Sequence, residues 1–277
     1  MKLTFLGTGT STGVPQMRCD CEVCRSSDPR DNRLRCSALL EIEEGLPGIL
    51  IDCGPDFRSQ MLREQSPDLA CAVLTHSHYD HVGGVDDLRP YAYSAPGEHF
   101  PLYCQADVAA DLRARIPYCF TDHPYAGVPQ FDLRIVEAYK TFSIDLGRGV
   151  TVEVLPLEII HGKLPILGYR FGSLAYITDA SYVPERTVEA LRGVDTLVIN
   201  ALRHEPHFSH LNLRQALDVI ELTAPRQAYL THFSHQIGLH SELLKMLPEN
   251  VHPASDRRQI IITDDKTLNY GSRNNLS

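Results

Sequence analysis

One ten-residue segment, residues 75–84, constrains this chain more than any other part of its sequence. Within six positions it contains four potential metal ligands: His76, His78, Asp80 and His81. The segment follows the apolar stretch 71–74 and ends in two glycines, which suits a tight turn after a buried strand. A neutral imidazole offers a lone pair to a metal ion, and a carboxylate adds negative charge. The segment therefore predicts a metal site at a strand end, with enough ligands for two ions.

Composition and charge narrow the class of protein. The 277 residues are 43% hydrophobic, and no Pro/Gly/Ser-rich linker or low-complexity segment divides them, which predicts a single domain over residues 1–277. No apolar run approaches the roughly 20 residues of a membrane span, so we expect a cytoplasmic protein that does not bind membranes. A formal net charge of -9 argues against binding to long nucleic acid. It leaves room for a small anionic substrate.

A cysteine-rich loop at residues 17–26 predicts a second metal site. It contains three of the eight cysteines, Cys19, Cys21 and Cys24, in a Cys-x-Cys-x-x-Cys pattern. Thiolates at this spacing converge on one tetrahedral ion, usually zinc. A closed structural site needs a fourth ligand from elsewhere in the chain, and we expect a histidine. A redox-active thiol cluster and unconnected surface thiols are the alternatives.

The hydrophobic pattern predicts a mixed α/β fold, of the α+β type. Apolar or alternating segments predict strands at residues 2–7, 37–42, 49–52, 71–75, 101–104, 131–138, 150–155, 175–178, 197–201, 228–231 and 259–263. Apolar residues three and four apart predict helices at residues 55–64, 107–116, 184–192, 211–222 and 241–247. Strands and helices recur in both halves of the chain. Two sheets sandwiched between helices would satisfy this order.

Three further candidate ligands follow predicted strands in the second half of the chain. They are His161, Asp179 and His232. A strand end is where a rigid scaffold leads into a loop that carries functional residues. Each residue taken alone is weak evidence, because a His or Asp at a strand end is more often a cap or an ordinary hydrogen-bonding group. Together with the first segment they give seven candidate ligands.

With these seven residues, the chain resembles the metallo-β-lactamase superfamily, whose His-x-His-x-Asp-His signature is present at residues 76–81. The resemblance covers nearly the whole chain and implies an αββα sandwich with a dinuclear metal site at one edge. It implies that one ion is bound by His76, His78 and His161. The other would be bound by Asp80, His81 and His232, with Asp179 as the bridge. Zinc, manganese and iron all suit such ligands.

The cysteine loop makes the resemblance more specific. It is similar to the loop of the phosphoribosyl cyclic phosphate phosphodiesterases of bacterial phosphonate degradation. In that subfamily three cysteines bind a structural zinc together with the second histidine of a Thr-His-x-Ser-His-Gln segment. Here the segment occupies residues 231–236. The resemblance therefore implies that His232 belongs to the dinuclear site and that His235 is the fourth zinc ligand.

The same resemblance implies a reaction. The substrate would be a ribose 1,2-cyclic phosphate or a similar small cyclic or diester phosphate, attacked by a hydroxide held between the two ions. Asp80 and His210 would be the catalytic residues, with His210 as the general acid and His204 and His207 as rivals for that role. Asp52 would orient a ligand histidine from behind. The resemblance also implies a homodimer.

Three other functions remain open from the sequence. A ribonuclease Z-like nuclease shares the metal motif, but we would expect a long Gly/Pro-rich arm and basic patches. A pyrroloquinoline-quinone biosynthesis-type protein also has a Cys-rich N-terminal loop. An inert metal-binding module would show erosion of the ligand set. Separately, a loop with Tyr118, Phe120, His123 and Tyr125 is a candidate lid, although aromatic packing explains it equally well.

Overall fold

The computed structural model of the protein describes residues 1–92, 99–121, 126–263 and 268–270. Within these residues, the first sheet has seven strands in the order β14-β1-β2-β3-β4-β5-β6. The strands are β1 Lys2–Gly7, β2 Ser37–Glu41, β3 Gly48–Ile51, β4 Leu69–Val73, β5 Phe100–Cys104, β6 Phe131–Ile135 and β14 Gln259–Ile261. The pairs β3·β4, β4·β5 and β5·β6 are parallel, so their carboxyl ends lie at one edge.

The second sheet, again within the described residues, runs β13-β12-β11-β10-β9-β8-β15, with β7 also paired to β8. Its strands are β7 Phe142–Asp145, β8 Val150–His161, β9 Leu164–Phe171, β10 Leu174–Tyr176, β11 Thr196–Asn200, β12 Gln227–Thr231, β13 Val251–Pro253 and β15 Leu268–Tyr270. The run from β10 to β13 is parallel. The carboxyl ends of β10 and β12 therefore also meet at one edge.

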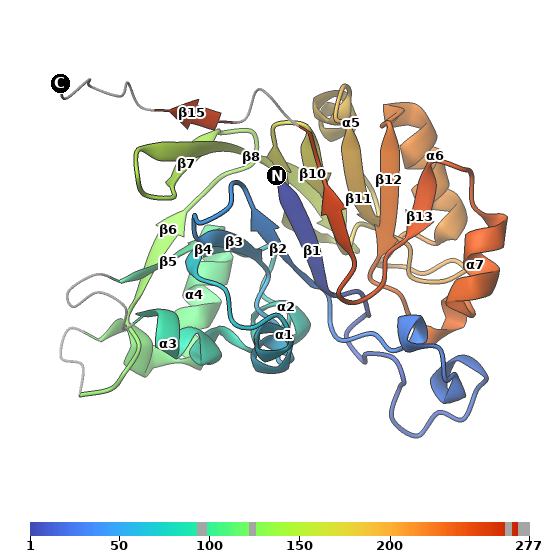
Figure 1. Cartoon of the computed structure of the whole chain (residues 1–277), viewed down its shortest axis with the longest axis horizontal. Coiled ribbons are helices and arrows are strands. Elements are labelled where there is room, and N and C mark those ends of the chain that lie inside the picture. Colours follow the sequence, from blue (N-terminus) through green and yellow to red (C-terminus); the bar gives the residue numbers. More distant parts are fainter. Residues whose placement is uncertain (93–98, 122–125, 264–267, 271–277) are drawn as a thin grey trace.

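Helices cover the outer faces of both sheets. They are α1 Phe57–Arg63, α2 Tyr79–Val82, α3 Arg89–Ala92, α4 Ala106–Arg115, α5 Glu185–Leu191, α6 Leu213–Thr223 and α7 His240–Met246. Figure 1 shows α5, α6 and α7 beyond the second sheet, on the opposite side of the molecule from α1 to α4. The order of layers is helix, sheet, sheet, helix. The predicted αββα sandwich is thus confirmed.

Three apolar cores correspond to the three contacts between these layers. The central core lies between the sheets and includes Leu3 and Phe5 of β1 with Tyr169 of β9. One outer core joins the first sheet to α1 and α4, and the other joins the second sheet to α5, α6 and α7. Alternation along β1 explains the division, because Leu3 and Phe5 face the central core while Leu6 faces the outer one. Each such buried side chain contributes about 1.5–3 kcal/mol.

The predicted strands and helices are present, with ends shifted by a few residues, except that β8 is much longer than expected. The predicted strand ended at residue 155, yet β8 continues through Pro156 to His161. Pro156 pairs with Tyr169 of β9, and its carbonyl accepts a hydrogen bond from Tyr139 on the other side. A strand residue directs its N–H and C=O to the same side. The missing N–H therefore faces away from β9, and the β8–β9 pairing is intact.

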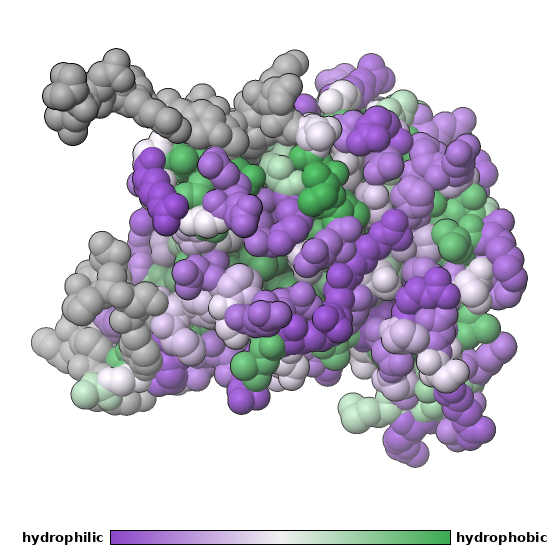
Figure 2. Space-filling view, viewed as in Figure 1, coloured by the Kyte–Doolittle hydropathy of each residue, from purple (hydrophilic) through white to green (hydrophobic). Residues whose placement is uncertain are grey.

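The surface is mainly hydrophilic where Figure 2 shows it, with apolar residues in separate patches. Among the described residues, no helix is long and apolar enough to cross a membrane. Of the candidate lid, His123 and Tyr125 lie outside the described residues. Tyr118 and Phe120 belong to a short 3-10 helix and pack against the outer core of the first sheet, which supports the packing interpretation.

Candidate metal centre

The structure brings all seven predicted ligands of the dinuclear site together at the edge where the sheets meet. They form two groups in which all ligand atoms lie within 4.8 Å of one another. The first group contains His76, His78, His161 and Asp179. The second contains Asp80, His81, Asp179 and His232. Helix α2, which carries Asp80 and His81, lies at this edge in Figure 1. His78 is exposed, so the first group opens to solvent.

Asp179 belongs to both groups, and its two carboxylate oxygens face different groups. Its Oδ2 lies 3.7 Å from His76 Nε2. Its Oδ1 lies 2.9 Å from His232 Nε2 and 3.5 Å from His81 Nε2. One oxygen toward each group is the arrangement that a carboxylate bridging two ions requires.

Hydrogen bonds behind the ligands select the imidazole nitrogen that faces the site. His81 Nδ1 lies 2.7 Å from Asp52 Oδ2, and His76 Nδ1 lies 3.0 Å from Thr75 Oγ1. His161 Nδ1 lies 2.9 Å from the carbonyl oxygen of Asp179. In each case the partner accepts a proton from Nδ1, which leaves the Nε2 lone pair for a metal ion. Asp52 thus occupies the supporting position that the resemblance implied.

Thr75 extends this support. Its hydroxyl donates to Asp52 Oδ2 at 2.9 Å and its backbone N–H donates to Asp52 Oδ1 at 2.8 Å. One carboxylate therefore fixes two residues of the β4 loop. Asn200 acts similarly on the second sheet, because its buried amide receives and gives a hydrogen bond at the backbone of Ala180. That pair of bonds holds the chain directly after Asp179.

In the second group, the buried carboxylates strongly favour positive charge on the imidazoles beside them. Burial by itself would lower the pKa of His232, but Asp179 and Asp80 together outweigh it and raise that pKa to about 10. Burial likewise opposes the shift at His81, yet Asp179, Asp80 and Asp52 raise its pKa well above the usual value. The pKa of Asp179 is far below its ordinary value despite burial, because His232 and His81 lie beside it. Divalent ions bound in place of the imidazole protons would supply the same positive charge.

A second observation, a buried ligand atom without a hydrogen-bond partner, also indicates that this donor set fits two metal ions. The Nε2 atom of His76 is buried, forms no hydrogen bond with any described residue, and lies 3.7 Å from its nearest carboxylate partner, Asp179. A buried polar atom without a partner is costly unless something else coordinates it. Imidazole nitrogens with two carboxylates suit zinc, manganese or iron. The geometry therefore supports divalent metal binding here and leaves the choice among these ions open.

His210 lies beside both groups. Its ring centroid is 4.8 Å from that of His161 and 5.0 Å from that of His232. The rival His207 stacks on His210 with ring centroids 5.2 Å apart, and His204 contacts the carbonyl of Ile237 instead. Burial lowers the pKa of His210 to about 3. A role as general acid therefore requires an anionic phosphate to enter and raise that pKa.

The cysteine loop and His235 form the third group. The sulfurs of Cys19, Cys21 and Cys24 and a nitrogen of His235 lie within 4.8 Å of one another. His235 Nδ1 is 3.3 Å from Cys19 Sγ and 3.2 Å from Cys21 Sγ. The contact with His235 lowers the pKa of Cys21 to about 6, whereas burial raises that of Cys24 to about 11. Three sulfurs and one imidazole are a donor set typical of structural zinc.

His232 and His235 serve different groups although they are three residues apart. His232 follows β12 with a positive φ of 57°, and the 3-10 helix His235–Ile237 begins after Ser234, whose side chain accepts from Gln236. This turn directs the two rings to separate sites. The loop at residues 17–26 is thereby tied to the strand that carries a ligand of the dinuclear group.

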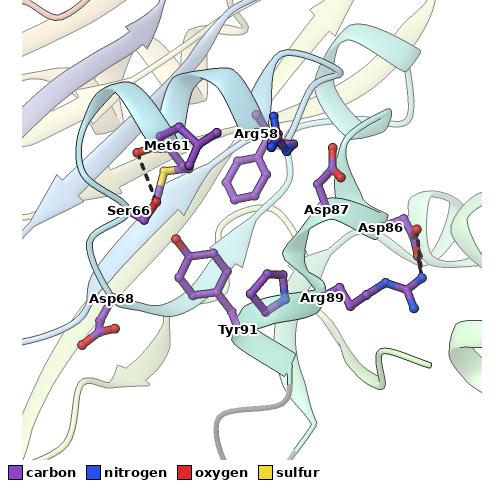
Figure 3. A pocket seen from close by; sticks show the side chains of 11 residues that line it. Arg58, Met61, Ser66, Asp68, Asp86, Asp87, Arg89 and Tyr91 are labelled. Carbon is purple, nitrogen blue, oxygen red and sulfur yellow. Dashed lines mark hydrogen bonds and ion pairs between the residues drawn. The ribbon is translucent and has the colours of Figure 1, made fainter. Parts of the chain in front are cut away.

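A separate pocket of about 480 Å³ lies between α1 and α3. Figure 3 shows Arg58 and Met61 of α1 across this pocket from Tyr91, with the Asp86–Arg89 ion pair at its rim. None of the seven ligands lines it. The pocket therefore does not contribute to the metal centre.

The sequence analysis did not single out Thr75, Thr178 or Asn200, each of which holds a ligand or the backbone beside one. All three are fully buried polar residues at or just beyond strand ends. In the sequence they look like ordinary strand residues, because their roles depend on partners 20 or more positions away or on the side-chain direction of a neighbour. Thr75 had the one visible signal, its place directly before the His-rich segment.

The fold and the two ligand groups define a class of protein, and the sequence comparison agrees. Residues 48–233 match the profile of the beta-lactamase superfamily domain. The chain therefore belongs to the metallo-β-lactamase superfamily.

Among solved structures, a diphosphatase from the PhnP family is similar. It shares 38% sequence identity and a TM-score of 0.84, over 94% of this chain and 96% of the other. A protein of Porphyromonas gingivalis named octanoyltransferase is 40% identical over 97% of this chain, which spans only about half (53%) of that relative. A coenzyme PQQ synthesis protein B of Methylorubrum populi is 30% identical over 72% of each chain. Resemblance to the PhnP family thus extends over nearly the whole chain.

Proposed function

We propose that this protein is a metal-dependent phosphodiesterase that hydrolyses a small cyclic or diester phosphate, with a ribose 1,2-cyclic phosphate as the foremost candidate. The position of Asp179 carries the proposal, because one of its oxygens faces each of two ligand groups. Two divalent ions held about 3.5–4 Å apart are an arrangement that cleaves phosphoesters. Similarity to a PhnP-family diphosphatase supports chemistry at phosphorus.

Different residues of the site would bind the ions, orient a ligand and donate a proton. When bound, two divalent ions lower the pKa of a water molecule and neutralise phosphate oxygens. His76, His78 and His161 would hold one ion, Asp80, His81 and His232 the other, and Asp179 both. Asp52 keeps His81 in the required tautomer. His210 stands beside both groups and would give a proton to the departing sugar oxygen.

The negative net charge of the chain favours a small substrate. The net charge of -9 disfavours a long polyanion, whereas a single phosphate is matched by the ions themselves. The Cys19-Cys21-Cys24-His235 group has the ligands that the resemblance assigns to phosphodiesterases of phosphonate degradation, and we propose one structural zinc there.

Replacement of the shared carboxylate is the direct test. Asp179→Ala should lose activity on a chromogenic phosphodiester, because neither ion keeps its full ligand set. Asp132→Ala removes a carboxylate from an exposed ion pair on β6 and should keep full activity. Wild-type turnover by Asp179→Ala, with its fold verified by circular dichroism, would contradict the proposal.

A second candidate function comes from the similarity to coenzyme PQQ synthesis protein B. The sequence resemblance implies that proteins of that type also carry a Cys-rich N-terminal loop. The two functions differ in their reactants. Metal-dependent oxygen consumption without phosphodiesterase activity would favour the second candidate, and phosphodiester turnover without oxygen consumption would favour the first.

A further inference from the structure

A buried hydroxyl contacts the carboxylate that joins the two ligand groups. Thr178 Oγ1 donates to Asp179 Oδ1 at 2.8 Å, and the Thr178 side chain is fully buried. The contacted oxygen is the one that faces His81 and His232, not the one that faces His76. The hydrogen bond therefore distinguishes the two oxygens and opposes rotation of the carboxylate.

A buried thiol and a phenol lie behind this hydroxyl. Cys36 Sγ is 3.7 Å from Thr178 Oγ1 and 3.2 Å from the hydroxyl oxygen of Tyr176. The hydroxyl of Thr231 lies 3.5 Å from the same sulfur. All four side chains are fully buried. Polar contacts in such a low-dielectric setting are strong, and they fix side-chain positions more firmly than apolar packing alone.

The four residues come from both sheets. Tyr176 ends β10 and Thr178 follows two positions later, Thr231 ends β12, and Cys36 directly precedes β2 of the other sheet. The cluster therefore spans the two sheets directly beneath Asp179. Tyr176 and Cys36 belong to the central apolar core, where a polar network is costly unless its groups satisfy one another.

We propose that Thr178 is a positioning residue for the two-ion site, held in place by Cys36 and Tyr176. Its hydroxyl fixes the rotation of the Asp179 carboxylate, so that one oxygen serves each ion. The inference rests on the proposed two-ion site, and it adds residues that contact no metal ion or substrate themselves. Loss of such a supporting partner typically weakens metal binding by about 10–100-fold.

Three variants separate positioning from general stability. Thr178→Val keeps the shape and removes the hydroxyl, Thr178→Ser restores the hydroxyl, and Tyr176→Phe removes only the far end of the cluster. Thr187→Val is the matched control, because Thr187 is equally buried and its hydroxyl donates to the carbonyl of Glu158 at 2.7 Å, away from the ligand groups.

Zinc content per chain, measured after equilibration at graded free Zn²⁺, gives a readout that needs no substrate. Thr178→Val should require about 10–100-fold more free Zn²⁺ than wild type to fill the dinuclear groups, with Thr178→Ser near wild type and Tyr176→Phe shifted in the same direction by less. Thr187→Val should match wild type. Wild-type zinc binding by Thr178→Val, or an equal loss in Thr187→Val, would overturn the inference. Because no substrate enters this assay, its result is independent of whether the phosphodiesterase proposal holds.

Discussion

Three residues of the candidate metal centre have a backbone conformation that side chains other than glycine rarely adopt. The φ angles are 61° at Asp52, 55° at Asp179 and 57° at His232. Such left-handed conformations cost about 1–2 kcal/mol per residue. Each follows a strand of the sandwich directly or within three residues, where hydrogen bonds from neighbouring segments hold it. At these three of the ten positive-φ positions occupied by residues other than glycine, the strained turn carries a candidate ligand or the carboxylate that supports one.

Replacement of His210 tests its role in protonating the leaving group. His210→Asn should lower kcat by about 10²–10⁴-fold for a diester with an alkoxide leaving group, because that oxygen needs a proton. A p-nitrophenolate leaves without one, so its release should change far less. The corresponding change at the rival position, His207→Asn, should leave the ratio of the two rates unaltered. Equal losses on both substrates in His210→Asn would contradict the assignment.

His240 links stability to pH in a buried ionic cluster away from the dinuclear groups. Its Nδ1 lies 3.4 Å from Arg33 Nη2, and its side chain is 3% exposed. Burial, aided by Arg33, lowers its pKa from 6.5 to about 4. Between these values the unfolded chain binds the proton and the folded chain does not. The free energy of unfolding should therefore fall as pH drops from 6.5 to 4, by up to about 1.4 kcal/mol per pH unit.

His240→Gln keeps an acceptor for Arg33 and removes the titration. Urea unfolding at pH 7 and pH 4.5 should show a smaller loss of stability for this variant than for wild type. An identical pH dependence of the two proteins would contradict the assigned direction of the shift.

At the scale of secondary structure, periodicity predicted strands such as β1 and β12 well, and missed β9. Gly168 lies in the middle of β9, and glycine in a sequence reads as a strand breaker. In the structure a Cβ at this position would lie 3.0 Å from the carbonyl oxygen of Tyr176 and 3.1 Å from Ile177. Glycine is favoured there because the segment of β10 and Ile177 approaches closely. That preference depends on the neighbouring strand and is invisible in the local sequence.

Helix α2 was missed for a different reason. It has four residues, too few to show a helical period, although it carries two predicted ligands. Ligand types at strand ends gave the seven candidates, and the family resemblance implied that their side chains form one site. The supporting contacts of Thr178 and Asn200 could not be predicted, because they depend on the direction in which each buried side chain points.

The cysteine loop can be tested as an element. Cys21→Ser should lower zinc content by one ion per chain, because a hydroxyl replaces a thiolate ligand, and should lower the thermal midpoint. Elemental analysis and a thermal melt measure both. Cys119→Ser changes a buried cysteine outside the ligand groups and should keep the zinc. An unchanged zinc content in Cys21→Ser would contradict a structural zinc site at residues 17–26.

At the scale of the whole molecule, the candidate dinuclear site exists only where both sheets are packed. His76, His78, Asp80 and His81 follow β4 of the first sheet, whereas His161, Asp179 and His232 belong to the second. The central core between the sheets holds these two sets of ligands in place. Metal binding and packing of the sandwich are therefore coupled, since each ion group needs residues from both sheets.

The homodimer and the cytoplasmic location, which the sequence analysis gave as expectations, stay predictions. So does the single-domain organisation over residues 1–277. None of them alters the chemistry at the sheet edge, because every ligand of the proposed centre comes from this one chain.

A substrate screen with the metal-reconstituted protein tests the proposed function most directly. It compares kcat/KM for a ribose 1,2-cyclic phosphate, a linear dinucleotide, a phosphomonoester and a lactone. We expect the cyclic phosphate to be hydrolysed fastest, with turnover lost on chelation and restored by Zn²⁺, Mn²⁺ or Fe²⁺. Preferential cleavage of the lactone would contradict a phosphoester-cleaving centre.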